Sequence, residues 1–400
     1  MKNASGFSIF LILLFAVLIA ICHGKSMLLV GDFARAFDVA PARASWIVSA
    51  VAVIAALASP IVTWLVTRFG ERRSITVGLL IAGGCSYLES LTGGFYPFLA
   101  LRVVEGAGYI TVVLAALALL IHTTQGALRV RALAFWSVAS PLGGAIAIFA
   151  VSPYIGGDWR VVFKGHAIVL ALLLLAIPLL PAANLASKGE RKPFAGIFGI
   201  YRHPSILRLA AAVGAPLTAA LGLVTVVPHY FINVLNIEPA TIGMVATLSI
   251  LSSVLAGGVA GYILTARVGP LAVVIGAFGG LALEIFVFLP GVSANAAILA
   301  KIFQGFFGSF VTAWVFTNIP KMSPGGNVMG AGGIAEQFLY ISMFLGPMIL
   351  FPLYMLESRL PFFIVLAIAS LLPLLLLPLD LRNVWNARRP EDKRVAPEAR

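Results

Sequence analysis

Two short polar patterns place charged side chains inside apolar stretches of the chain. Arg102 and Glu105 lie three residues apart, so a helix puts both on one face, and Tyr109 follows on that face one turn later. Lys301 and Gln304 repeat this spacing in the second half, with an amide in place of the acid. Placing an ionisable side chain in hydrocarbon costs free energy, so such a residue usually has a neutralising partner or a function. The patterns favour ion pairing or proton exchange by Glu105 and ligand binding by the two cations.

Other ionisable residues interrupt apolar stretches as well. Lys25 lies late in the first stretch, and Glu336 and Gln337 lie some seven residues into the eleventh. A glutamate there is too short to reach water easily, so Glu336 is a candidate proton carrier. Glu284 is a candidate partner for Lys301 and a third candidate proton carrier. We therefore predict substrate binding by Lys25, Arg102, Lys301, Gln304, Gln337 and Tyr109, and proton coupling by Glu105, Glu336 and Glu284.

Each of these residues also has a purely structural interpretation. Lys25 and Lys301 are long enough to extend to an interface, and Arg102 and Glu105 can simply neutralise each other. Glu336 can bond to a neighbouring helix. For two further residues we favour the structural interpretation over a functional one. Glu89 lies near a predicted helix end, and His166, which could titrate, has no evident partner. We expect Glu89 at the membrane interface.

The composition excludes a water-soluble globule. Of 400 residues, 60% are hydrophobic and only 10% are charged, whereas a soluble domain is about a quarter charged. The two cysteines, Cys22 and Cys85, lie in apolar runs, so no disulfide framework is implied. The sequence has no metal-ligand spacing, phosphate loop or nucleophile–histidine arrangement. We expect no enzymatic activity, no metal and no cofactor.

Apolar stretches of about 20 residues predict an all-α membrane protein with twelve transmembrane helices. The predicted spans are 6–30, 43–66, 74–92, 97–121, 131–155, 161–183, 205–232, 241–264, 270–290, 296–318, 329–355 and 361–381. These divide the chain into a six-helix bundle (1–183), a cytoplasmic linker (184–204), a second six-helix bundle (205–381) and a cytoplasmic tail (382–400). The apolar run 7–22 after Lys2 also resembles a signal peptide, but Ile21 before Cys22 is a poor cleavage residue.

The basic residues predict the orientation of the helices. With the N-terminus inside, 19 of the 27 Lys and Arg residues lie in cytoplasmic segments, five lie outside, and three lie within spans. This bias predicts cytoplasmic termini in a bacterial-type inner (plasma) membrane. It also explains the net charge of +12 without nucleic acid.

The two halves of the chain repeat each other. Arg68-Phe69-Gly70 recurs as Arg267-Val268-Gly269, and the Arg102 pattern recurs at Lys301, both at an offset of 199 residues. The segment 38–42 recurs at 236–240, at an offset of 198. Two six-helix repeats of one topology predict an axis along the membrane normal, with the substrate path between them.

Several motifs resemble the major facilitator superfamily, and more narrowly its drug:proton antiporter branch. The segment 63–73 is similar to the family's first cytoplasmic-loop motif, which implies gating roles for Arg68, Gly70, Arg72 and Arg73. Two departures are Thr63 for the usual glycine and Thr67 for the usual aspartate, which implies a weaker gate latch. The segment 102–108 resembles the motif whose arginine is linked to proton coupling. Asp158-Trp159-Arg160 resembles the start of the sixth helix, whereas the antiporter motif around Pro141 is incomplete.

The resemblance implies a monomeric transporter that binds a small-molecule substrate and protons within the lipid bilayer. We expect proton-driven efflux by alternating access. The branch more often has an acid in the first helix, which suits cationic drugs. Lys25 instead favours an anionic or zwitterionic cargo, such as a siderophore or organic-acid metabolite, and a drug remains an alternative substrate. A proton-coupled uptake symporter of the same fold is the first alternative. A membrane enzyme or receptor without transport is the second.

Overall fold

The computed structural model describes residues 5–181, 198–266 and 268–379. Its long elements are all helices, and eleven of the described segments are long and apolar enough to cross a membrane. A shorter apolar helix, α14, completes the predicted twelve. The first half contains α1 (Gly6–Gly24), η1 (Met27–Leu29), α2 (Val30–Phe37), α3 (Pro41–Ala44), α4 (Trp46–Phe69), α5 (Glu71–Leu91), α6 (Phe95–Thr123), α7 (Gly126–Val151) and α8 (Arg160–Ala176). The second half contains α9 (Pro204–Asn233), α10 (Pro239–Ile263), α11 (Gly269–Val287), α12 (Ala294–Met322), α13 (Val328–Tyr354) and α14 (Leu360–Leu376).

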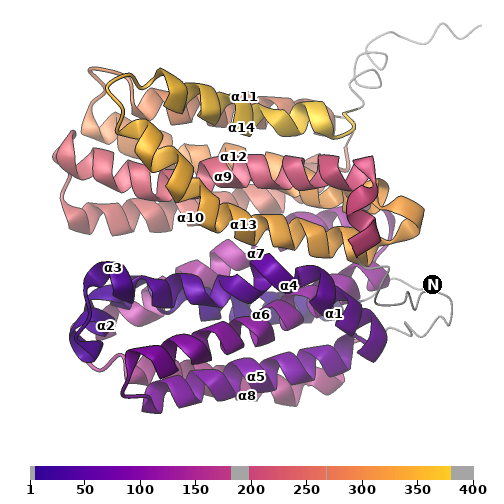
Figure 1. The fold of residues 1–400 in the computed structure, drawn as a ribbon. Coiled ribbons are helices and arrows are strands. Elements are labelled where there is room, and N and C mark those ends of the chain that lie inside the picture. Colours follow the sequence, from indigo (N-terminus) through magenta and orange to yellow (C-terminus); the bar gives the residue numbers. More distant parts are fainter. Residues whose placement is uncertain (1–4, 182–197, 267, 380–400) are drawn as a thin grey trace, which may run out of the picture.

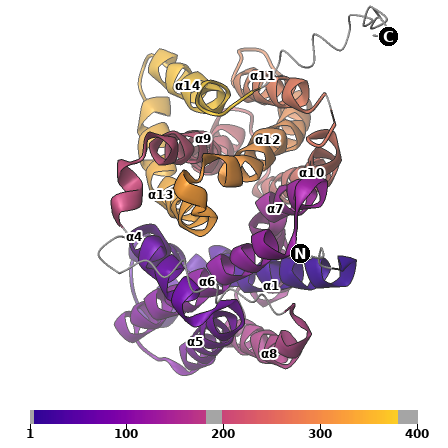
Figure 2. The same cartoon turned by 90° about the vertical axis from the view of Figure 1, so that its right-hand side faces the viewer.

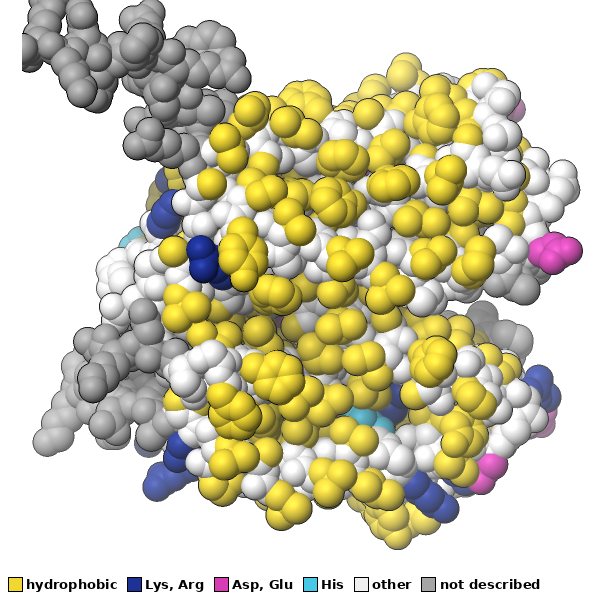
Figure 3. Space-filling view, turned by 180° about the vertical axis from the view of Figure 1, so that it is seen from behind, with side chains coloured by type: hydrophobic (Ala, Val, Ile, Leu, Met, Phe, Trp, Pro, Cys, Tyr) yellow, Lys and Arg dark blue, Asp and Glu magenta, His cyan; other side chains and the backbone are white. Residues whose placement is uncertain are grey.

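These bounds agree with the predicted spans to within about five residues, with two exceptions. The first span continues through η1 and α2 to Phe37, and α8 ends at Ala176, seven residues before the predicted end of the sixth span. The predicted tail (382–400), Arg267 and most of the predicted linker (184–204) lie outside the described residues. Figure 1 shows α1–α8 in one layer and α9–α14 in the other. Hydrophobic side chains cover the flank in Figure 3, and charged ones gather towards its two ends. This distribution fits a protein that crosses a bilayer.

Local signals in the sequence set the helix ends. The side chain of Ser5 accepts a hydrogen bond from the backbone N–H of Ser8 and caps α1. Ser293 caps α12 and Asn327 caps α13 in the same way. Gly70 has a φ of 86° between α4 and α5, a conformation that favours glycine, so the chain reverses there within one residue.

The backbone repeats where the sequence repeats. Asp38 has a φ of 50° and Asn236 a φ of 53°, and among the described residues these are the two non-glycine residues with positive φ. They lie at the offset of 198 found in the sequence. Asp38 directly follows α2 and Asn236 lies three residues after the end of α9. Each lies three residues before the proline that begins the next helix, so the two halves make a similar turn at the same place.

Close helix contacts repeat as well. A Cβ atom on Gly106 of α6 would overlap the carbonyl group of Val51 on α4. A Cβ atom on Gly305 of α12 would lie 2.6 Å from the carbonyl oxygen of Ser249 on α10. Glycine is therefore required at both positions for the two backbones to approach.

We expect Gly106→Ala to destabilise the protein by about 1–3 kcal/mol, because the added methyl group meets backbone atoms that cannot rotate away. Gly84→Ala is the matched control, since a Cβ atom there has nothing within 4 Å. The measurement is the free energy of unfolding of the full chain in mixed micelles titrated with SDS. Equal stability of the two variants would contradict the predicted contact.

The two halves pack together at one end of the molecule. We call the end where α1 begins the N-terminal face. Figure 2 looks onto this face and shows α13 beside α4, and α10 beside α7. The largest hydrophobic cluster joins both halves here, and a smaller one joins Ala134 of α7 to Ala256 and Ala260 of α10.

Towards the opposite face, the hydrophobic clusters each belong to one half. One is formed by residues 219–369, and the other, around Phe33, Phe98, Trp159 and Phe163, by residues 29–163. The halves are therefore joined more closely at the N-terminal face than at the opposite face.

Candidate functional site

Three predicted residues form a buried ionic centre in the first half. Lys25 at the end of α1 and Arg102 and Glu105 of α6 are fully buried. Lys25 Nζ lies 2.6 Å from Glu105 Oε1, and Arg102 pairs with Glu105 Oε2. Arg102 also donates to the carbonyl oxygens of Ile47 and Cys22 at 3.2 and 3.0 Å. Glu105 is thus held between two cations, and Lys25 does not extend to an interface.

Two further residues of this centre were not expected from the sequence. Glu89 Oε2 of α5 lies 3.4 Å from Lys25 Nζ, and Glu89 is fully buried, so its predicted interfacial position is wrong. His166 of α8 is also not isolated, because its Nδ1 lies 3.3 Å from Lys25 Nζ and 3.8 Å from Glu105 Oε1. Lys25 also donates to Ser86 Oγ at 2.7 Å. Lys25 therefore connects helices α1, α5, α6 and α8.

The burial of Glu89 has a structural cause. The aromatic cluster of Phe33, Phe98, Trp159 and Phe163 closes the end of the first half above the ionic centre. Lys25 Nζ lies 4.3 Å from the centre of the Phe163 ring, in cation–π geometry. Counting residues from a helix end underestimates how deeply a side chain is buried when an aromatic cluster such as this one covers that end of the helix. The sequence signal was the spacing of Ser86 and Glu89, which puts both on one helix face.

The ionic centre also contains potential metal ligands. Ligand atoms of Cys22, Glu105 and His166 all lie within 4.8 Å of one another. A bound cation would stand beside Lys25 and Arg102, and it would compete with both for Glu105. Charge pairing therefore accounts for this arrangement better than metal binding does.

The second half has a corresponding network. Lys301 Nζ donates to Gln304 Oε1 at 2.8 Å, and Gln304 Nε2 donates to Glu284 Oε1 at 2.8 Å. Ser370 Oγ of α14 donates to the other Glu284 oxygen at 3.2 Å. The amide therefore links Lys301 to Glu284, which was the partner proposed from the sequence. Helices α12, α11 and α14 contribute here as α6, α5 and α8 do in the first half.

A third group of residues lies where the two halves meet. The hydroxyl groups of Tyr109 on α6 and Tyr340 on α13 share a hydrogen bond. Trp136 Nε1 of α7 donates to Glu336 Oε1 at 3.1 Å. Within the described part of the chain, no Lys, Arg or His side chain forms an ion pair with Glu336. Glu336 is 3% exposed, so its carboxyl group has little contact with solvent, and its side-chain hydrogen bond comes from the indole N–H of Trp136.

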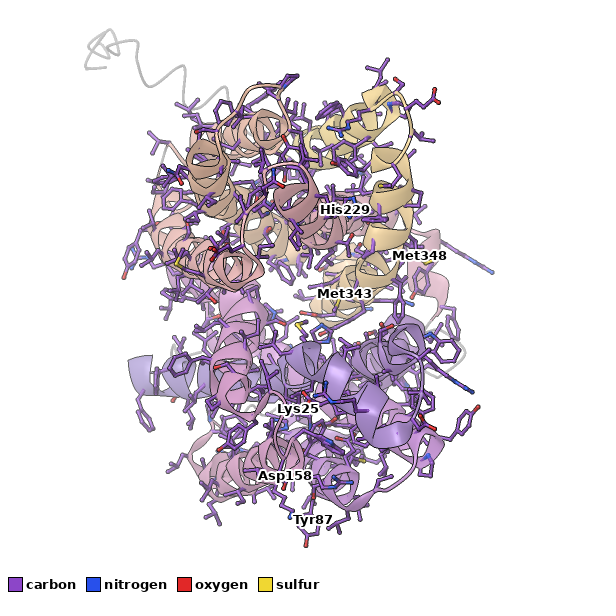
Figure 4. All side chains as sticks on the ribbon, turned by 90° about the vertical axis from the view of Figure 1, so that its left-hand side faces the viewer. Lys25, Tyr87, Asp158, His229, Met343 and Met348 are labelled. Atoms are coloured by element: carbon purple, nitrogen blue, oxygen red, sulfur yellow. The ribbon has the colours of Figure 1, made fainter. Side chains whose placement is uncertain are left out.

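Gln337 forms further hydrogen bonds where the two halves meet. Its Nε2 donates to the carbonyl oxygen of Ala56 on α4 at 2.9 Å, and its Oε1 accepts from the Tyr201 hydroxyl. In Figure 4, Lys25 lies inside the first half, and Met343 lies on the side of the second half that faces it. The predicted residues thus separate into one group inside each half and one group between the halves. Trp136 and Tyr340 were not found by sequence reasoning, because neither the local motifs nor the repeat pairs Trp136 with Glu336 or Tyr340 with Tyr109.

The predicted gating residues lie together at the N-terminal face. Arg68 is exposed near the end of α4, and its guanidinium lies 5.2 Å from the centre of the Trp64 ring. Arg72 is half-buried and Arg73 is exposed in the first turn of α5, after the turn at Gly70. This loop lies at the end of the molecule where the halves make contact.

Comparisons with known proteins agree with this architecture. The family model described as "Major Facilitator Superfamily" matches residues 5–347. Among curated proteins, the chain is 24% identical to Monocarboxylate transporter 13 of Bos taurus over 324 residues, which cover 79% of this chain and 74% of that protein. It is 29% identical to the Multidrug export protein EmrB of Haemophilus influenzae over 149 residues, which cover 36% of this chain and 28% of that protein. The match thus spans little more than a quarter of that export protein.

Solved structures show the same fold. The human organic anion transporter MFSD10 (TETRAN) has a TM-score of 0.77 at 16% identity, covering 92% of this chain and 98% of that one. The proton:xylose symporter XylE, bound to 6-bromo-6-deoxy-D-glucose, has a TM-score of 0.70 at 14% identity, covering 93% and 95%. At these identities the likeness concerns the fold.

Proposed function

The chain belongs to the Major Facilitator Superfamily, and from this premise we propose that it is a proton-coupled secondary transporter that exports a small organic molecule by alternating access. The observation that carries the proposal is the ionic centre of Lys25, Arg102, Glu105 and Glu89 inside an apolar bundle. The two positive charges of this centre balance the two negative charges of its carboxylates. Binding or loss of one proton changes the net charge of the buried centre, and such a change strongly favours one conformation over another.

We place the cargo between the halves, near Tyr109, Gln337 and Glu336. Arg102 and Lys301 are each engaged inside one half, so direct contact with an anionic cargo requires their present bonds to open. An anion that competes with Glu105 for Lys25 and Arg102, or with Gln304 for Lys301, would do this. A siderophore or an organic acid has carboxylate or similar groups for such competition.

The orientation follows from the basic residues. We place the N-terminal face and both termini on the cytoplasmic side of a bacterial-type inner membrane. Most Lys and Arg residues lie in the loops and terminal segments that this orientation puts on the cytoplasmic side. In this orientation the halves are closed on the cytoplasmic side, which corresponds to an outward-facing state of a monomer.

Charge accounting supports uptake by symport as a second candidate. A proton that neutralises a carboxylate in the ionic centre leaves Lys25 and Arg102 in excess. That excess favours simultaneous binding of an anion, which is the linkage that a proton–anion symporter requires. Export by antiport instead requires proton and cargo to exclude each other, which this ionic centre favours for a cationic cargo. Export therefore pairs with a cationic cargo and uptake with an anionic one, and the transport assay separates the two.

The test uses proteoliposomes that contain the full chain and an imposed pH gradient. The probes are radiolabelled pyruvate as a monocarboxylate and ethidium as a cationic dye, each compared with empty liposomes. Gradient-driven flux of either probe supports proton coupling, and the side on which the probe accumulates decides between export and uptake. Flux of a probe that ignores the gradient would contradict coupling.

We expect Glu336→Gln to abolish gradient-driven accumulation of the transported probe while exchange of the probe across the membrane continues. The variant keeps an acceptor for the Trp136 N–H but cannot exchange a proton. Glu357→Gln, at an exposed position after α13, is the control. If Glu336→Gln kept its full response to the gradient, Glu336 would not be a proton carrier.

A further inference from the structure

The two carboxyl groups of the ionic centre are unequally neutralised. Glu105 accepts from Lys25 at 2.6 Å through one oxygen and pairs with Arg102 through the other. Glu89 meets Lys25 at 3.4 Å through Oε2. No donor from the described residues reaches Glu89 Oε1, although this atom is buried. Each Glu105 oxygen therefore has a close cation, and one Glu89 oxygen has none.

Protonation has opposite consequences at the two positions. A proton on Glu105 would leave Lys25 and Arg102 facing a neutral group, and uncompensated buried cations are costly. A proton on Glu89 removes a charge that has one distant partner, and it satisfies an orphaned oxygen. Lys25 would keep its 2.6 Å contact with Glu105. A neutral Glu89 is the lower-cost way for the centre to hold a proton.

We propose that Glu89 is the proton-binding carboxyl group of the first half and that Lys25, which it shares with Glu105, responds to its protonation. The two carboxyl oxygens that face Lys25 cannot be further apart than the sum of their distances to Nζ, 6.0 Å. When Glu89 is ionised, Lys25 is attracted to both. When Glu89 is protonated, Lys25 forms an ion pair with Glu105 alone. The charge of the two cations and two carboxyl groups then changes from zero to +1.

Other groups around Glu89 and its partner Lys25 fit this assignment. Cys22 of α1 contacts His166 of α8, Cys85 and Ser86 lie on α5, and Arg102 and Glu105 lie on α6. His166 Nδ1 lies beside Lys25 Nζ, at 3.3 Å, which opposes a second positive charge on the histidine. Glu89 is thus the carboxyl group of this centre that shares its cation, Lys25, with Glu105 and has one oxygen that no described donor reaches. The inference rests on proton coupling in the proposed function, and it assigns the proton to a residue of α5 outside the motif of α6.

The first experiment needs no variant. The purified full chain in detergent is treated with dicyclohexylcarbodiimide, which modifies protonated carboxyl groups in apolar surroundings, over a range of pH, and the modified peptides are identified by mass spectrometry. We expect Glu89 to carry several-fold more label than Glu105, and this label to fall as the pH rises. Preferential labelling of Glu105, or labelling of Glu89 that ignores pH, would overturn the assignment.

A second measurement decides the matter if the reagent labels neither residue. Infrared difference spectra between low and high pH are recorded for the wild type, Glu89→Gln and Glu105→Gln. Glutamine has the shape of a protonated glutamate, so we expect Glu89→Gln to fold and to lose a carboxylic-acid band that titrates. An unchanged band would refute the proposal. A titrating Glu89 with gradient-independent transport would instead refute the proposed coupling, and gradient-driven transport without a titrating Glu89 would refute only this assignment.

Discussion

Replacing Glu105 with leucine is expected to destabilise the folded protein by about 3–5 kcal/mol, because removal of one partner leaves buried charges uncompensated. Both Lys25 and Arg102 are fully buried and depend on this carboxylate. Glu89 alone would then face two cations. The measurement is the free energy of unfolding in mixed micelles, with exposed Glu238→Gln as a control expected to change it by less than about 0.5 kcal/mol.

A compensating variant separates loss of charge balance from loss of packing. Lys25→Met combined with Glu105→Leu removes one charge of each sign and leaves Arg102 with Glu89. We expect the double variant to be more stable than Glu105→Leu alone, although it carries one more change in the core. If the changes in unfolding free energy caused by the two substitutions were simply additive, charge balance would not be what stabilises this centre.

The sequence allowed the prediction of features that depend on local spacing. Arg102 and Glu105 share a helix face, so their ion pair followed from an interval of three residues. The repeat of segment 38–42 at 236–240 was also found in the sequence, and the positive φ that Asp38 and Asn236 share agrees with that repeat. Helix positions followed from apolar length.

Features that depend on packing between distant segments could not be predicted in this way. Glu89 was placed at an interface because its depth was counted along one helix, whereas the cap that buries it comes from α2, α6 and α8. Trp136 and Glu336 meet across the boundary between the halves, 200 residues apart, where no repeat relates the two. Lys25 was recognised as unusual, but its four helical partners required the fold.

The second large effect concerns the closed N-terminal face. A Cβ atom on Gly333 of α13 would overlap the hydroxyl oxygen of Thr63 on α4 and lie 3.1 Å from its Cβ. The loop-motif aspartate is replaced by Thr67, whose hydroxyl donates to the carbonyl oxygen of Trp64 in its own helix, at 2.8 Å. We propose that close packing at Gly333 takes over part of the latch that the aspartate supplies in the motif.

We expect Gly333→Ala to disfavour the closed N-terminal face by about 1–3 kcal/mol, which reduces its population relative to the open state by about 5- to 150-fold. Closure is followed by the rate of disulfide crosslinking between cysteines placed at Ala134 and Ala260, which lie in one buried cluster across the boundary. The expected result is slower crosslinking than in the same cysteine pair with Gly333 intact.

Gly332→Ala is the matched control for this effect. Its added methyl group would lie 3.2 Å from the end of the Leu117 side chain, which can rotate, so we expect a small change. Thr63→Ala added to Gly333→Ala should restore part of the crosslinking rate, because it removes the hydroxyl that the new methyl group meets. Equal effects at both glycines, or no recovery with Thr63→Ala, would show that the contact between α4 and α13 does not control closure. Recovery would instead place the latch in glycine packing, at the position where the sequence departs from the loop motif.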